Sequence, residues 1–84
     1  MPTLFRLDGL RVVIYPNHHS PAHVHVIGTM AEAVFELNCP DGSMALRESY
    51  RFKAKKLRRL MNAMDPQLSL LCDEWERIHD PEEC

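Results

Sequence analysis

The chain has 84 residues, which is enough for one domain with a modest hydrophobic core. Its 10 Lys and Arg nearly balance its 12 Asp and Glu. No apolar run approaches the roughly 20 residues of a membrane-spanning helix, and the N-terminal segment lacks the apolar stretch of a signal peptide. These features exclude an integral membrane protein and predict a single cytoplasmic domain over residues 1–84.

Residues 1–48 have the alternating apolar and polar pattern of β-strands. The dipeptide Asp8-Gly9 lies between two β-rich runs, which favours a tight type I′ hairpin turn. Met44 and Leu46 are expected to face inward if the last of the runs also forms a strand. The expected strands are residues 3–7, 10–15, 23–27, 31–37 and 43–48.

Residues 52–79 have the periodicity of two helices. Asp65 is a good N-cap and Pro66 a good first helical residue, so the second helix is expected to begin there. With almost no loop between them, the helices should form a tight corner or hairpin. Residues 80–84 are expected to be a frayed tail. The apolar stripes are Leu57, Leu60, Met61 and Met64 on the first helix, and Leu68, Leu71, Cys72, Trp75 and Ile78 on the second.

One apolar strand face and two apolar helix stripes predict an α+β fold. We expect an antiparallel sheet of four or five strands with both C-terminal helices packed on one face. The three cysteines, Cys39, Cys72 and Cys84, are an odd number without close spacing, so they indicate neither a disulfide framework nor a metal knuckle. Cys72 lies on the apolar helix stripe and is expected to be a buried thiol.

The densest chemical feature is a histidine segment. Because side chains alternate along a strand, His23 and His25 should share one face while Val24 and Val26 face the core. That arrangement leaves both imidazoles on the open side of the sheet, next to the preceding loop. The segment contains four of the five histidines, His18, His19, His23 and His25.

The pairing of the two central strands depends on the turn between them. A two-residue Gly28-Thr29 loop would place Glu32 opposite His25, with the Cβ atoms roughly 5 Å apart. The carboxylate would then favour the charged imidazolium or orient the neutral ring. A longer loop would break this pairing.

Three interpretations of the histidine segment compete. The first is exposed strand and loop histidines that bond locally. The second is a divalent metal site, for zinc or a similar ion, formed by His19, His23 and His25, with Glu32 as a fourth ligand or as support. The third is a proton-transfer or anion site that uses the same four residues. A nucleophile at Ser20 is disfavoured, because no glycine-rich elbow is present.

Charge is separated along the second half of the chain. Seven of the ten cations lie between Arg47 and Arg59, and seven of the twelve acids between Asp65 and Glu83. The basic run is either a solvated helix face or a surface for RNA phosphates or an acidic protein. DNA recognition by the helix pair is disfavoured, since the second helix is acidic. The candidate binding residues are Lys53, Lys55, Lys56, Arg58 and Arg59.

Two segments carry a resemblance to a known family. "PAHVHV" (Pro21–Val26), preceded by His19, and "LLCDEWE" (Leu70–Glu76) resemble the small bacterial family catalogued as domain of unknown function 4160. The chain departs from that family at His18, where an Asp is usual, and at Ala22, where a second Pro is usual. Any site that needs the carboxylate is therefore in question in this chain.

The resemblance implies a single-domain bacterial protein whose activity is not established. Members of that family are often encoded beside another small family, domain of unknown function 2442, which suggests a toxin–antitoxin-like pair. The leading hypothesis is an interaction protein that binds the neighbouring gene's product, and RNA as a further ligand, with homo-oligomerisation open. The alternative is a ribonuclease-like hydrolase or metal-binding protein that uses the histidines.

Overall fold

The structure is a computed structural model that describes residues 3–7, 9–15, 21–39 and 42–79. Several predicted features lie outside these residues: Asp8 of the first turn, the loop histidines His18 and His19, and the tail at 80–84. Within the described residues, no helix is long and apolar enough to cross a membrane.

The β half forms one antiparallel sheet in which each strand pairs with the next along the chain. This meander keeps the connections short. Gly9 has φ +77°, which agrees with the positive φ that the hairpin turn requires. The strands are β1 (Thr3–Leu7), β2 (Leu10–Val13), β3 (His23–Ile27), β4 (Glu32–Glu36) and β5 (Ala45–Tyr50).

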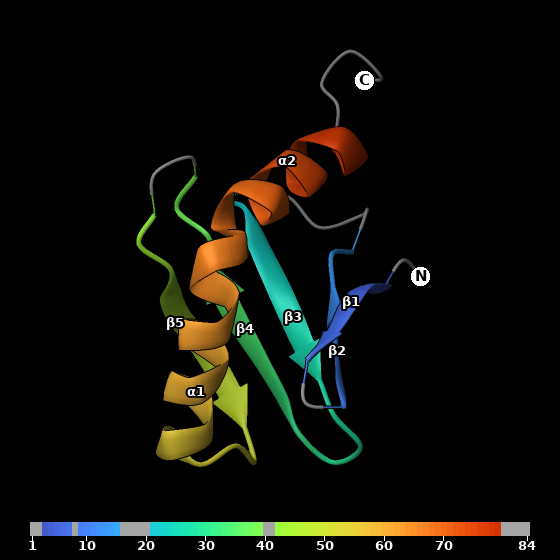
Figure 1. Ribbon diagram of the computed structural model, residues 1–84. Helices are drawn as coiled ribbons and strands as arrows, with labels where there is room; N and C mark the ends of the chain where they lie inside the picture. The colour runs from blue at the N-terminus through green and yellow to red at the C-terminus, as the bar shows by residue number, and fades with distance from the viewer. Residues whose placement is uncertain (1–2, 8, 16–20, 40–41, 80–84) are drawn as a thin grey trace.

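The helical half is one bent unit instead of a corner or hairpin. Helix α1 (Ala54–Met64) continues through a 3-10 turn, η1 (Asp65–Gln67), into α2 (Leu68–Ile78). Asp65 was expected to be an N-cap, but its backbone is helical and no side-chain cap bond is present at either junction. Pro66 lies in the first turn of η1, where its missing N–H is tolerated, so the chain bends without leaving the helical region (Figure 1).

The core lies between one face of the sheet and the helices. Figure 1 shows α1 lying over β4 and β5, and α2 near the end of the sheet where β3 begins. The sheet contributes alternate strand residues and the helices contribute their predicted stripes, as the α+β prediction requires. Fully buried members include Val12, Val24, Val26, Phe35, Leu60, Met64 and Leu71.

The fifth strand is present, at Ala45–Tyr50, but it is an edge strand and all six of its residues are exposed. Met44 is buried as expected, just before the strand. Leu46 was expected to face inward, and it pairs with the core residue Phe35, yet it is 43% exposed. Leu46 therefore lies on the inward face, as predicted, but it stays partly exposed because, among the described residues, no strand covers this edge.

The free-thiol prediction for Cys72 is also wrong. Cys72 is bonded to Cys39, with Cα atoms 5.8 Å apart. The two residues are 33 positions apart in sequence, so only the fold brings them within disulfide distance. The bond connects the turn after β4 to α2.

Candidate functional site

The turn between β3 and β4 is longer than predicted. His25 pairs with Val34, not with Glu32, so the loop spans residues 28–31 instead of Gly28-Thr29 alone. The register prediction is therefore wrong by two positions along β4. An even shift leaves every side chain on its predicted face, which is why the valines of β3 still face the core.

Glu32 nevertheless reaches His25. The two residues lie diagonally on the same face, and His25 Nδ1 donates to Glu32 Oε2 over 2.7 Å. His25 is only 9% exposed, whereas the side chain of Glu32 is about half exposed. The rings of Tyr15 and His25 lie almost perpendicular to each other, with centroids 4.6 Å apart. The carboxylate thus holds one ring orientation and one tautomer.

His23 is fixed in the same manner by a backbone acceptor. Its Nδ1 donates to the carbonyl oxygen of Pro21 over 2.8 Å, and its ring lies 5.4 Å from that of His25. Trp75 of α2 packs against it at 5.1 Å. His23 is 4% exposed, so the expectation of exposed strand histidines is wrong. Trp75 and Tyr15 cover a face that the strand pattern alone leaves open.

The fifth histidine, His79, also belongs to this cluster. Its ring stacks on that of Trp75 at a centroid distance of 3.9 Å. Five rings therefore form a continuous row in space, in the order Tyr15, His25, His23, Trp75 and His79. Sequence reasoning missed His79. The spacing of four residues from Trp75, which places both side chains on one helix face, could have revealed it.

The predicted metal site is only partly described. His23 and His25 lie side by side, and in each neutral ring the nitrogen that carries the lone pair is Nε2, because Nδ1 donates. His19 lies outside the described residues. Among the residues that are described, no group of three His, Cys, Asp or Glu side chains could hold a metal ion. The metal site remains a prediction that depends on His19.

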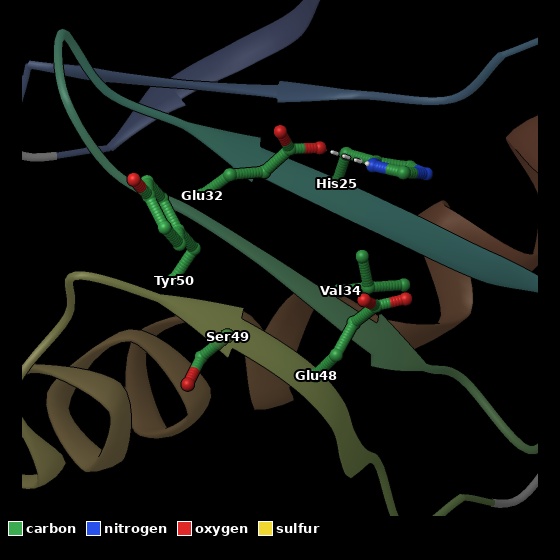
Figure 2. Close-up of a pocket in the computed structure, with 6 residues that line it drawn as sticks. All are labelled: His25, Glu32, Val34, Glu48, Ser49 and Tyr50. Atoms are coloured by element: carbon green, nitrogen blue, oxygen red, sulfur yellow. Dashed lines mark hydrogen bonds and ion pairs between the residues drawn. The ribbon is translucent and has the colours of Figure 1, made fainter.

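A pocket of about 270 Å³ opens on the face of the sheet away from α1. Figure 2 shows the carboxylate of Glu32 turned toward His25 and the imidazole extending away from Tyr50. The lining residues are His25, Glu32, Val34, Glu48, Ser49 and Tyr50.

Most of the predicted cations are exposed. Lys53 precedes α1 with an extended backbone, and only Lys56 is half-buried and engaged with another group. Helix α1 has no acidic residue in its first turn. We call the four exposed cations, Lys53, Lys55, Arg58 and Arg59, the cationic face.

Residues 9–76 match the family described as domain of unknown function (DUF4160). The chain belongs to this family. No curated protein and no solved structure matches the chain. The DUF4160 match includes His23, His25, Glu32 and the cationic face, and it ends before His79.

Proposed function

We propose that this DUF4160 protein is a cytoplasmic interaction protein that binds an acidic partner protein, as one component of a toxin–antitoxin-like two-gene module. The observation that supports the proposal is the cationic face of α1. The expected gene pairing of the family points in the same direction, since a two-gene module requires that its products recognise each other.

The first two cations of the cationic face, Lys53 and Lys55, oppose helix stability because they lie at the start of α1. Positive charge in the first turn of a helix is unfavourable against the helix dipole, by about 0.3–1 kcal/mol for each exposed charge. No side chain caps α1, and among the described residues no ion pair compensates Lys53, Lys55, Arg58 or Arg59. Residues that lower the stability of a fold without a compensating contact are expected where they bind another molecule. The uncapped, cationic start of α1 is such a place.

A protein partner fits the surface better than a nucleic acid. Single-stranded nucleic acid is usually held by exposed aromatic rings beside cations. Trp75 is buried in the core, and the exposed ring of Tyr50 lies on the pocket side of the sheet with the acidic Glu32, away from α1. The continuation of α1 into α2 also presents the acidic residues Asp73 and Glu76. An acidic protein surface can engage α1 alone, whereas a longer phosphate backbone would also meet α2.

Co-expression with the neighbouring gene's product tests the proposal. We expect co-purification, and binding that weakens by more than about tenfold in the Arg58→Glu/Arg59→Glu variant. The matched control is Arg6→Glu, which reverses an exposed arginine on the opposite edge strand. Circular dichroism confirms that each variant is folded.

Three results would contradict this function. The two proteins could elute separately, the double reversal could bind like the control, or single-stranded RNA could bind the chain tightly while the neighbouring product does not. The last result would replace the protein partner with RNA.

The contact between His25 and Glu32 favours a second candidate, a ribonuclease-like hydrolase. A carboxylate that fixes the imidazole tautomer is a common part of proton-transfer sites. Cleavage of a labelled RNA by wild type, but not by His25→Ala, would support it. Equal rates for the two proteins would remove it.

A further inference from the structure

Strand β5 is an uncovered edge of the sheet. It pairs with β4 on one side, and within the described part of the chain no strand lies on its other side. All six of its residues are exposed. Its outward backbone N–H and C=O groups are therefore able to pair with an added strand.

Large apolar side chains flank this edge on both faces of the sheet. Leu46 shares the helix-side face with Phe35, and Tyr50 shares the pocket-side face with Glu32. They are 43% and 61% exposed. An added strand would place its alternating side chains beside Leu46 on one face and Tyr50 on the other.

A β-bulge restricts what can pair here. The register with β4 shifts between Val34 and Phe35, which leaves Arg47 as an extra residue in β5. A bulge and charged side chains at an edge oppose pairing with another identical edge. The edge therefore suits a specific foreign segment better than a second copy of the chain.

Exposed cations follow the end of β5 along the chain. Figure 1 shows α1 lying over β4 and β5, and three residues separate the end of β5 from α1, so Lys53 and Lys55 of the cationic face follow this edge closely. Arg51, just after β5, is exposed, whereas Arg47 within the strand lies 3.9 Å from the carboxylate of Glu36 (Nε to Oε2). The pocket side carries Glu48 and Glu32 instead. An added strand should therefore carry acidic side chains on its helix-facing side.

We infer that the partner contributes an extended segment, acidic on one face, that adds to β5 as a sixth strand beside α1. The main chain of β5 supplies hydrogen bonds, and the cationic face supplies the charge selection. This inference rests on the proposed function and names the element through which the partner docks.

Hydrogen exchange of the complex with the neighbouring gene's product tests the inference. Amides within Ala45–Tyr50 that exchange rapidly in the free protein should slow by more than about tenfold in the complex. Amides of β1, the opposite edge, should not change. Leu46→Glu should weaken binding by more than about tenfold, because it places negative charge where the acidic face would lie, whereas Arg6→Glu should not.

Each outcome separates the two proposals. A complex that is sensitive to Arg58→Glu/Arg59→Glu but leaves β5 amides unprotected overturns only the strand addition. Equal protection at β1 and β5 also overturns it, since that pattern indicates general stabilisation. Protection of β5 in the free protein, together with a dimeric mass, would make the occupant a second copy. Absence of any complex overturns both proposals.

Discussion

Two histidines occupy strand positions where burial would normally require apolar side chains. A buried polar group is costly unless it is hydrogen-bonded. His25 and His23 meet that requirement with Glu32 and with the Pro21 carbonyl. These bonds, together with the ring contacts on both sides, allow β3 to carry imidazoles inside the fold.

Glu32→Gln tests the His25 bond. The neutral amide still accepts a hydrogen bond but without charge assistance, so we expect the free energy of unfolding to fall by about 1 kcal/mol. Urea denaturation measures the change. Glu48→Gln is the matched control, because Glu48 lines the same pocket and has no recorded bond to His25. Equal losses in the two variants would show that the contact does not stabilise the fold.

At the scale of elements, the start of α1 is where the proposed recognition role and the stability of the helix oppose each other. Lys53 holds the N-cap position with φ −76° and ψ 154° and makes no cap bond. A serine there can accept a hydrogen bond from the first turn and also removes a positive charge from the positive end of the helix. Lysine at position 53 therefore makes the start of α1 less stable than a capping residue would.

Lys53→Ser should raise the free energy of unfolding by about 1 kcal/mol and the melting temperature by about 4–8 °C. Under the proposed function, the same substitution should also weaken partner binding, because it removes one cation of the proposed binding surface. Lys53→Ala is the control that removes the charge without adding a cap. Thermal unfolding that is identical in the serine and alanine variants would contradict the capping argument.

The strands and helices follow from periodicity, and their order along the chain predicts the α+β fold. Register does not follow, because a two-residue or a four-residue turn after Ile27 leaves the same side chains on the same faces. Asp65 and Pro66 also favour a helix start by local rules. In the fold, Met64 before this pair and Leu71 after it are both buried in the same core. The backbone therefore stays helical across the junction.

The candidate site was harder to predict than the fold. The contact between His25 and Glu32 follows from the shared strand face, so it survived the wrong register. The burial of His23 depends on Trp75, which is distant in sequence, and no local pattern encodes that approach. The disulfide also joins two residues that are distant in sequence, Cys39 and Cys72, so no local pattern predicts it either.

At the scale of the whole molecule, a small core is supplemented by one covalent link. A chain of this length buries a limited fraction of its surface. The bond between Cys39 and Cys72 connects the sheet half to the helical half, one helical turn before Trp75. Docking of α2, and with it the cover over His23, therefore gains from the constraint that the bond places on the unfolded chain.

Removing this bond should have the largest effect of any change considered. A closed span of 33 residues is worth about 3–4 kcal/mol in the chain-entropy account. Cys39→Ser/Cys72→Ala should therefore lower the melting temperature by more than about 10 °C, and Cys84→Ser should not. A reducing agent should destabilise the wild type and leave the double variant unchanged. In a reducing cytoplasm the thiols would stay separate, and the weaker fold would gain more from binding the proposed partner. Titration of three thiols in the denatured, unreduced wild type would contradict the bond and would leave core packing alone to hold α2 against the sheet.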